Sequence, residues 1–299
     1  MRRHLDLLNV FLALRFKQPG YPSCLFSGNY LIQSIGVISI LSCGAKIAPD
    51  VIASRVDPDI TFLVEVKGGR DFDDDQFSRM LKTSSSDLRD LVYLPIRDVA
   101  THVVHLLYFC NNECAGDFVN RVGTRASVVG FDGERFSIYG ASLPDTQLAD
   151  CLSSSKVLSG ASPLGIVPFD GDSPDEEVAR AVIPHVIEAL IQGTGTVTDD
   201  LIVSKTHQVK SAMSSTGSGS EQSDIIKRTR RVLDDLATGE FSEWIERSRN
   251  QQPPIWRFLK ALSVDGRTRE LQKLQRAAYQ YLERKGAKQG LQLSFEQFN

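Results

Sequence analysis

The chain has 299 residues, of which 41% are hydrophobic, a fraction typical of a folded globular protein. This length favours two domains of ordinary size. With 34 Lys and Arg against 37 Asp and Glu, the chain as a whole is no polycation. Basic residues gather late, because the stretch from Ile225 onward holds 15 Lys or Arg and 9 Asp or Glu. Any affinity for nucleic acid is therefore expected in the C-terminal part.

The five cysteines form no zinc-binding pattern, because no second pair of Cys or His matches Cys110 and Cys114. An odd number of cysteines without a secretory signal favours reduced, mostly buried thiols in the cytoplasm. The stretch between Lys17 and Lys46 carries no charge, but polar residues, Pro and Gly interrupt it. Its apolar window is shorter than the roughly 20 residues that span a membrane. We expect it to be buried core, with no membrane as a partner.

In chain order, the first expected element is a helix over residues 3–16, whose dense apolar side chains indicate burial on most sides. A Pro-Gly pair at positions 19 and 20 ends it. The apolar run from Tyr30 to Ile47 fits either a strand or a buried helix that turns into a strand. Its periodicity does not decide between the two.

The next stretch predicts a β-hairpin. Residues 50–56 form one β-compatible run, an Asp-Pro-Asp turn follows, and residues 60–67 form a second run rich in β-branched and aromatic residues. A turn centred near position 58 places Asp50 opposite Val66 and next to Glu65. Two carboxylates are therefore expected to meet on adjacent strands.

The second strand of this hairpin has two different faces. Because side chains alternate, Leu63, Glu65 and Lys67 project to one face and the apolar residues between them to the other. The apolar face is expected to be buried, while the other presents Glu65 and Lys67 beside Asp50. Alternating charges on a solvated strand need no function, so the combination of residues and spacing carries the interpretation.

This group of residues suits a hard divalent cation. Mg²⁺ prefers oxygen ligands and usually takes one or two carboxylates together with waters and substrate phosphate. We expect Asp50, Glu65 and the backbone carbonyl of Val66 to be metal ligands. Lys67 is expected to orient or deprotonate the attacking water, or to stabilise the charge that grows on the phosphate.

The arrangement of Pro49-Asp50, fourteen intervening residues and Glu65-Val66-Lys67 resembles the PD-(D/E)XK nuclease superfamily. The resemblance implies a restriction-endonuclease-like mixed sheet flanked by helices, and Mg²⁺ as cofactor, with Mn²⁺ able to substitute. An alternative motif that begins at Asp59 ranks second, because too few residues separate it from Glu65. Many nucleases of this group keep a Glu in their first helix. This chain departs from that pattern, because Asp6 is its only acid before Asp50.

A helix is expected over residues 71–81, with several Asp residues favourably placed at its N-terminus. The resembled superfamily often has a Gln near the active site on this helix, which implies a catalytic role for Gln76. Arg79 lies one turn later on the same face and is a candidate contact to nucleic acid, although it equally fits a surface ion pair. A buried strand over residues 102–110 and a hairpin over 126–139 complete an α/β domain at residues 1–145.

Residues 146–173 are expected to be a linker, and residues 174–299 a second, mainly helical domain. Helices are expected at 175–192, after 198, at 225–236 and at 267–285, with a polar loop at 214–223. This order is similar to a winged helix-turn-helix. Its third helix would present basic residues to DNA, namely Lys227, Arg228, Arg230 and Arg231. A basic helix is also commonly just a solvated surface.

The hypothesis that follows is a Mg²⁺-dependent endonuclease that hydrolyses DNA phosphodiester bonds in restriction, antiphage defence or mobile-element processing. The alternative is a catalytically inactive nuclease fold that acts as a DNA-binding or regulatory protein. A third possibility is an enzyme that a partner protein switches on through the C-terminal half. DNA is favoured over RNA as partner. A homodimer is expected because cutting both strands of a duplex takes two such sites.

Overall fold

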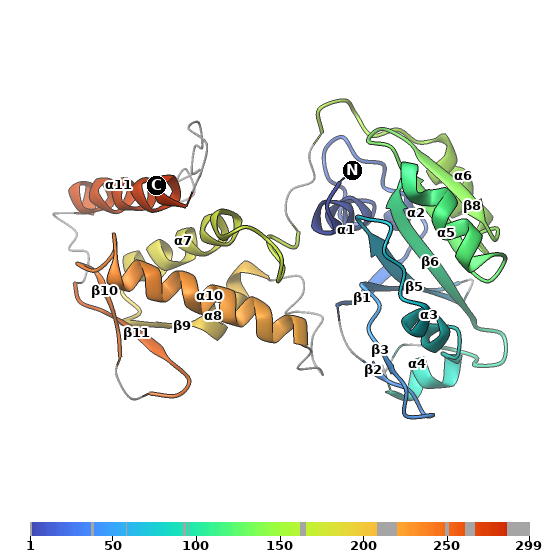
Figure 1. Ribbon diagram of the computed structural model, residues 1–299, viewed down its shortest axis with the longest axis horizontal. Coiled ribbons are helices and arrows are strands. Elements are labelled where there is room, and N and C mark those ends of the chain that lie inside the picture. The colour runs from blue at the N-terminus through green and yellow to red at the C-terminus, as the bar shows by residue number, and fades with distance from the viewer. Residues whose placement is uncertain are drawn as a thin grey trace. The chain divides into compact units, whose positions relative to one another are not determined.

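The computed structural model of the chain describes residues 2–36, 39–57, 59–91, 94, 96–161, 166–207, 220–248, 251–260 and 267–285. They divide into two compact units, with the boundary between Val167 and Pro168 (Figure 1). Most of the polar loop expected at 214–223, and the turn residue Pro58, lie outside the described residues.

The first unit is built on a mixed sheet of six strands in the order β1-β4-β5-β6-β7-β8. The neighbours β5, β6 and β7 run parallel, and the other pairs are antiparallel. A small second sheet pairs β2 with β3. The described part of residues 30–47 thus contains strands, which resolves the open alternative. The strands are β1 (Leu31–Ile35), β2 (Ser39–Ile40), β3 (Lys46–Ile47), β4 (Val51–Val56), β5 (Asp59–Lys67), β6 (Val103–Asn111), β7 (Ser127–Phe131) and β8 (Phe136–Gly140).

Helices cover both faces of this sheet (Figure 1). On one face α1 packs through Phe11, whose ring centroid lies 5.5 Å from that of Phe109 on β6. On the other face, residues of α3 and α5 share a buried cluster with Leu63 and Tyr108. The helices of the unit are α1 (His4–Ala13), α2 (Cys24–Ser27), α3 (Asp74–Met80), α4 (Ser85–Leu91), α5 (Ala115–Val122) and α6 (Thr146–Ser154), with a 3₁₀ turn at Asn112–Cys114.

The predicted hairpin is present as β4 and β5, with a register one residue away from the expected one. Val51 pairs with Val64, whereas a turn centred at 58 would pair it with Glu65. The strand is also buried on both faces rather than one, because it lies between β4 and β6 and beneath helices on either side. Glu65 is consequently only 5% exposed, so the expected solvated face is absent.

The segment 146–173, expected to be a linker, contains α6 and residues of both units. Asp145 caps this helix, because its Oδ1 accepts a hydrogen bond from the N–H of Leu148. Its Oδ2 accepts hydrogen bonds from Tyr30 and Arg55, which ties the start of α6 to the sheet. These buried polar contacts attach the helix to the first unit.

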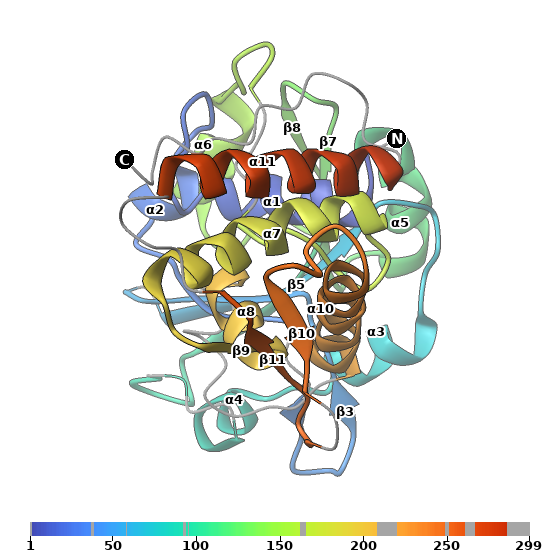
Figure 2. The same cartoon turned by 90° about the vertical axis from the view of Figure 1, so that its left-hand side faces the viewer.

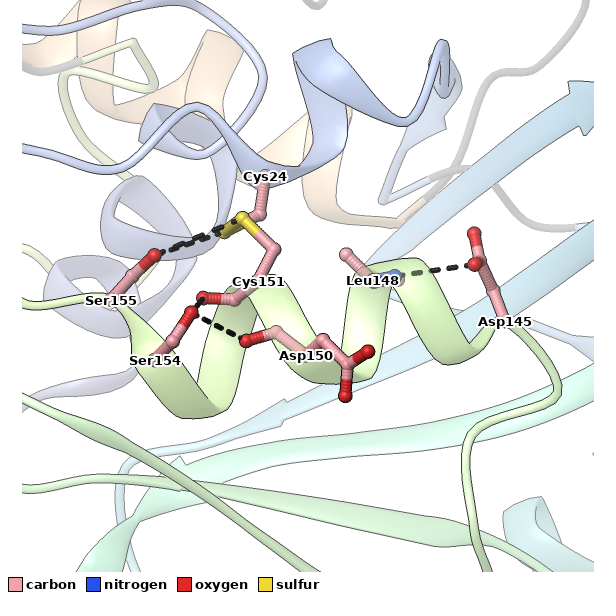
Figure 3. Close-up of a disulfide and its surroundings, with 7 residues drawn as sticks. All are labelled: Cys24, Asp145, Leu148, Asp150, Cys151, Ser154 and Ser155. Carbon is pink, nitrogen blue, oxygen red and sulfur yellow. Dashed lines mark hydrogen bonds between the residues drawn. A yellow bond between two sulfur atoms is a disulfide. The ribbon is translucent and has the colours of Figure 1, made fainter.

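A disulfide between Cys24 on α2 and Cys151 on α6 makes a second attachment (Figure 3). The expectation of five reduced thiols is therefore wrong for these two residues. Folding brings them to a Cα–Cα distance of 5.7 Å although 127 positions separate them, and spacing along the chain cannot reveal this. Cys110 and Cys114 are buried thiols outside any disulfide, and Cys43 is an exposed one. The expected cytoplasmic location rested on reduced thiols, and the disulfide removes that support.

The second unit combines four described helices with a three-stranded antiparallel sheet in the order β10-β11-β9. Its core contains the buried rings of Trp256 and Trp244. Figures 1 and 2 show α11 alongside α7. The elements are α7 (Asp175–Gln192), β9 (Thr196–Thr198), α8 (Asp199–Thr206), α10 (Ser220–Thr238), β10 (Ile245–Arg247), β11 (Ile255–Phe258) and α11 (Arg267–Arg284). Among the described residues of both units, no helix combines the length and apolarity needed to cross a membrane.

Candidate active site at the end of strand β5

Asp50 lies immediately before β4, and backbone contacts on both sides hold it. Its Oδ2 accepts a hydrogen bond of 2.7 Å from the N–H of Val66. Its own carbonyl accepts one of 2.8 Å from the N–H of Gly36 on the neighbouring chain segment. The carboxylate is thereby directed to the C-terminal end of β5, beside Glu65. The closeness of these two carboxylates agrees with the sequence prediction, even though the register differs by one residue.

Glu65 is held by two side chains, one on each carboxylate oxygen. Lys67 places its Nζ 2.8 Å from Oε1. Gln76 donates from Nε2 to Oε2 over 2.8 Å, and also to the carbonyl of Ala48 over 3.1 Å. Because an amide nitrogen has two hydrogens, Gln76 can make both bonds at once. Four residues predicted from the sequence thus meet in one place.

The position of Gln76 follows from the way α3 begins. Asp73 precedes the helix and its Oδ1 accepts the N–H of Gln76 at 2.8 Å, which is the usual role of an N-cap aspartate. The cap fixes the first turn, which carries Gln76, against the end of β5. The Asp-rich sequence before this helix is therefore what aims the amide at Glu65.

The electrostatics of the site bring the ionisation of Glu65 close to neutral pH when no cation is bound. Burial, reinforced by the charge of Asp50, raises the pKa of Glu65 to about 7, although Lys67 and His4 act in the opposite direction. Burial lowers the pKa of Lys67, but the carboxylates of Glu65, Asp50 and Asp73 together outweigh this effect and the pKa ends above its ordinary value. Lys67 is therefore an ammonium group at neutral pH, and Glu65 is poised to lose its proton there.

His4 is a site residue that sequence reasoning missed. It opens α1, and its Nε2 lies 3.2 Å from Oδ1 of Asp50. Asp6, considered as the acid of the first helix, instead binds Arg3 at 3.1 Å and is exposed. The first helix thus contributes an imidazole rather than a carboxylate. Nothing in the spacing of the sequence indicates this contact, because it depends on how α1 packs on the sheet.

The N-terminal segment is anchored to the sheet by Asn111 at the end of β6. Asn111 accepts from the N–H of Arg2 and donates to the carbonyls of Arg2 and Gly68, at 2.8 to 2.9 Å. A Cβ atom on Gly68 would lie 2.4 Å from the backbone nitrogen of His4. Gly68 is thus required because the N-terminal segment passes directly over it.

The donor set fits a hard cation that keeps part of its water shell. Asp50 and Glu65 supply two carboxylates, and Mg²⁺ commonly takes one or two carboxylates from a protein. The residues that the structure describes contain no cluster of three or more His, Cys, Asp and Glu able to hold a metal. Any ion here would therefore depend on waters and substrate for its remaining ligands. The role of the Val66 backbone carbonyl as a metal ligand stays a prediction.

Arg79, the other residue predicted on α3, is partly buried. Its Nε is inaccessible to solvent and has no hydrogen-bond partner in the described part of the chain. A contact of Arg79 with nucleic acid stays a prediction.

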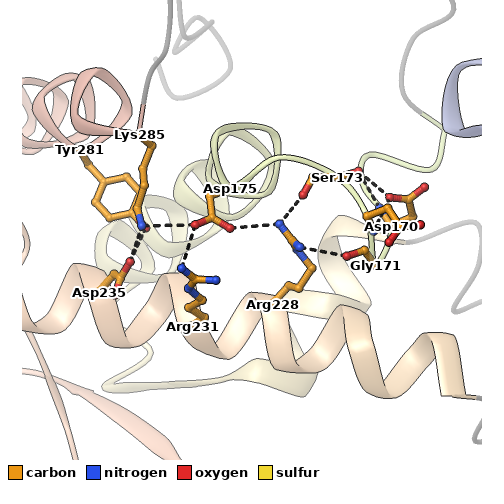
Figure 4. A network of polar contacts seen from close by, with 10 residues as sticks. Asp170, Gly171, Ser173, Asp175, Arg228, Arg231, Asp235, Tyr281 and Lys285 are labelled. Atoms are coloured by element: carbon orange, nitrogen blue, oxygen red, sulfur yellow. Dashed lines mark hydrogen bonds and ion pairs between the residues drawn. The ribbon is translucent and has the colours of Figure 1, made fainter. Parts of the chain in front are cut away.

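The four predicted basic residues of α10 divide into two pairs. Arg228 donates to the carbonyls of Gly171 and Ser173 and pairs with Asp175 at 3.1 Å (Figure 4). Arg230 pairs with the buried Asp199 at 2.7 Å. These two arginines therefore serve the internal structure of the unit.

Lys227 and Arg231 differ from that pair because they are 67% and 66% exposed. They also have acidic neighbours, at 3.0 Å from Asp224 and 3.3 Å from Asp175. Exposed ion pairs of this kind are weak and can exchange for phosphate oxygens. Of the four, Lys227 and Arg231 are the better placed for an external ligand.

A cavity of about 1060 Å³ lies between α10 and the connection from β10 to β11. It contains two arginines, and each has an acidic partner: Arg230 with Asp199, and Arg247 with Asp234 at 2.8 Å. Its other lining residues, within the described part of the chain, are Ser248, Gln251, Gln252, Pro253 and Pro254.

Comparisons of the chain with protein-family models, with curated proteins and with solved structures found no match. The class that the structure itself defines is an α/β protein with a mixed six-stranded sheet flanked by helices, followed by a mainly helical unit.

Proposed function

We propose that this chain is a Mg²⁺-dependent endonuclease of the PD-(D/E)XK type that hydrolyses phosphodiester bonds in DNA. The observation that carries the proposal is the convergence of Asp50, Glu65, Lys67 and Gln76 at one end of the β4–β5 hairpin. Lys67 and Gln76 each contact Glu65 over 2.8 Å, and Asp50 accepts a hydrogen bond from the N–H of Val66, the residue after Glu65. Such a group has no evident structural purpose, because it places two carboxylates in a largely buried position at an energetic cost. A buried acid with a raised pKa beside a second carboxylate, as Glu65 is beside Asp50, is typical of functional sites.

Asp50 and Glu65 are the residues that would hold Mg²⁺ or Mn²⁺. A bound ion polarises the phosphate and lowers the pKa of a bound water. Gln76 fixes the orientation of Glu65, as partners of metal ligands commonly do. The raised pKa of Lys67 keeps it protonated at neutral pH, so its role is to stabilise the charge on the phosphate rather than to act as a general base.

The second unit is proposed to bring DNA to this site. Among its described residues, the order of helix, strand, two helices and two strands resembles a winged helix, in which the third helix enters the DNA groove. That helix is α10, where Lys227 and Arg231 are the exposed cations. A homodimer would supply the second active site needed to cut both strands.

Nicking of supercoiled plasmid by the full chain, with and without Mg²⁺, tests the proposal directly. Asp50→Asn and Lys67→Ala are expected to lower cleavage by at least about a hundredfold while DNA binding is retained. Asp75→Asn, which removes an exposed carboxylate on α3, is the matched control and should cleave normally. Wild-type rates in Asp50→Asn would overturn the assignment.

The alternative is an inactive nuclease fold that acts as a DNA-binding or regulatory protein. The observation in its favour is that the described residues place a histidine, not a glutamate, from the first helix beside Asp50. Calorimetry with Mn²⁺ separates the two. A nuclease should show a heat of Mn²⁺ binding that is lost in Asp50→Asn, whereas an inactive fold without a cation site should show no such heat in either protein. A third arrangement, activation by a partner protein, predicts cleavage only after that partner is added.

A further inference from the structure

Two cations share one aromatic ring just after helix α1 of the first unit. The guanidinium carbon of Arg15 lies 5.0 Å from the centroid of the Phe26 ring, and Nζ of Lys17 lies 3.7 Å from the same centroid. Lys17 is exposed, Arg15 is partly buried, and Phe26 is 37% exposed. Contacts of this kind hold a cation in place without neutralising its charge. We call Arg15, Lys17 and Phe26 the basic patch.

No carboxylate balances the charge of the basic patch. Residues 7–49 contain no Asp or Glu. Within the part of the chain that the structure describes, neither Arg15 nor Lys17 forms an ion pair. The two exposed cations of α10 differ, because each lies within 3.3 Å of an aspartate. The basic patch can therefore bind an external anion without first giving up an internal partner.

Backbone hydrogen bonds fix the aromatic ring against the end of α1. The carbonyl of Leu14 accepts from the N–H groups of Leu25 and Phe26, at 3.1 and 3.2 Å. These bonds seat α2 on the end of α1, and the disulfide of Cys24 ties α2 to α6. The ring that holds both cations is thereby attached from two sides. Little ordering is then needed when a ligand binds, which favours affinity.

Lys17 has a backbone conformation that a lysine rarely adopts. Its φ is +49°, in the left-handed region that favours glycine. Residues held in such conformations cluster at functional sites. A cation beside the C-terminal end of a helix also stabilises that helix, which is a purely structural role. Glycine at this position would relieve the backbone and remove the charge, so it separates stability from binding.

The basic patch lies at the opposite end of α1 from the active site. His4, at the start of this helix of 10 residues, contacts Asp50. A helix rises about 1.5 Å per residue, so the patch lies roughly 15–20 Å from the active site. Each strand of a DNA duplex carries one phosphate per about 3.4 Å of axis, so this distance corresponds to about four to six base pairs.

The surroundings of the basic patch favour nucleic acid over a lipid surface. Anionic lipids also attract cations, but a helix that binds a membrane presents a broad apolar face to it. The apolar residues of α1 are instead buried in the first unit. The Phe26 ring is already engaged by both cations. Phosphate oxygens of DNA need only the exposed charges, and Arg and Lys are common donors to them.

We propose that Arg15 and Lys17 bind phosphates of a DNA duplex about four to six base pairs from the bond that is cleaved. Such contacts add affinity and fix the position of the duplex, but carry no sequence preference. The inference rests on the proposed nuclease function for its position relative to the cut. Binding of DNA by the basic patch can be measured without any cleavage.

Fluorescence polarisation of a DNA duplex with the full chain, in EDTA and at several salt concentrations, tests the proposal. Each phosphate contact contributes about 0.9 to the slope of log affinity against log salt. The double variant Arg15→Ala, Lys17→Ala should therefore reduce the magnitude of the slope by about 1.8. A matched control, Arg89→Ala with Arg97→Ala, removes two exposed arginines and should leave the slope unchanged. An unchanged slope in the first variant, or equal reductions in both, would overturn the proposal.

Lys17→Gly distinguishes binding from a structural role. It should reduce the magnitude of the slope by about 0.9. Its melting temperature should be unchanged or higher, because relief of the backbone offsets the lost contact with Phe26. A lower melting temperature with an unchanged slope would show that Lys17 only stabilises the end of the helix, and the proposal would fail.

The remaining outcomes separate this site from a lipid surface and from the nuclease assignment. If the double variant loses binding to anionic phospholipid vesicles but keeps the wild-type slope on DNA, the patch is a lipid surface and the proposal is wrong. A reduced slope in a protein that never nicks plasmid would refute the nuclease function but keep the phosphate site. Normal nicking with an unchanged slope would refute the phosphate site alone.

Discussion

The Nε2 atom of Gln76 lies 2.8 Å from Oε2 of Glu65, so an amide on α3 holds a buried carboxylate of β5 in one orientation. Replacing Gln76 by Ala should lower Mg²⁺-dependent cleavage by about 10- to 100-fold, as is typical when the partner of a metal ligand is lost. Plasmid nicking measures the effect. Gln33→Ala is the matched control, because Gln33 makes a similar amide contact to Ser54 on β4. Equal losses in both variants would contradict a specific role for Gln76.

The raised pKa of Glu65 predicts that cation binding depends on pH. A carboxylate must lose its proton to bind Mg²⁺, so affinity should rise with pH up to about 7 and level off above it. Calorimetric titrations between about pH 6 and pH 8 cover this window, in which the fraction of ionised Glu65 changes most. An affinity independent of pH would show that Glu65 is already ionised.

The same shift affects stability in the absence of metal. Because the folded-state pKa is raised, the folded protein binds this proton more tightly than the unfolded chain does. The contribution to stability is present at low pH and is lost as pH rises through about 7. Denaturant unfolding of Glu65→Gln should lack this decline, a difference of roughly 1–3 kcal/mol at mildly alkaline pH. Identical pH profiles of the unfolding free energy in the wild-type protein and in Glu65→Gln would refute this prediction.

Gly68 and Gly69 are adjacent glycines with different surroundings. A Cβ atom on Gly68 would lie 2.4 Å from the backbone nitrogen of His4, whereas one on Gly69 would have no atom within 4 Å. Gly68→Ala should therefore displace the N-terminal segment and destabilise the protein by about 1–3 kcal/mol. Gly69→Ala should leave the melting temperature unchanged. Similar melting curves for the two variants would contradict the close approach.

The disulfide between Cys24 and Cys151 predicts three titratable thiols in the denatured, unreduced protein and five after reduction. Breaking it with Cys151→Ser should cost about 2–4 kcal/mol of stability, because it closes a long loop. Cys43→Ser, at an exposed free thiol, is the control and should cost little. Five reactive thiols without a reductant would show that the bond does not form.

The arginines and lysine of α10 should separate structural from binding roles. Arg230→Ala leaves the buried Asp199 without its cation and is expected to destabilise the second unit by about 3–5 kcal/mol. Lys227→Ala should leave stability unchanged but reduce the salt dependence of DNA binding by about one unit of slope. Fluorescence polarisation at several salt concentrations, together with thermal melting, distinguishes the two effects.

Several elements were predictable because local chemistry dictates them. The hairpin at 50–67 follows from alternation and an Asp-Pro-Asp turn, and α3 begins where Asp73 can cap it. The pairing of Asp50 with Glu65 needed only strand geometry, which tolerates a register error of one residue.

Tertiary structure alone decided the rest. The contact of His4 with Asp50, the disulfide and the acidic partners of Arg228 and Arg230 join residues far apart in the chain. Such contacts depend on the packing of helices against a sheet, which leaves no periodic trace in the sequence. The sequence therefore determined which residues carry the chemistry of the hairpin, and packing decided which others surround it.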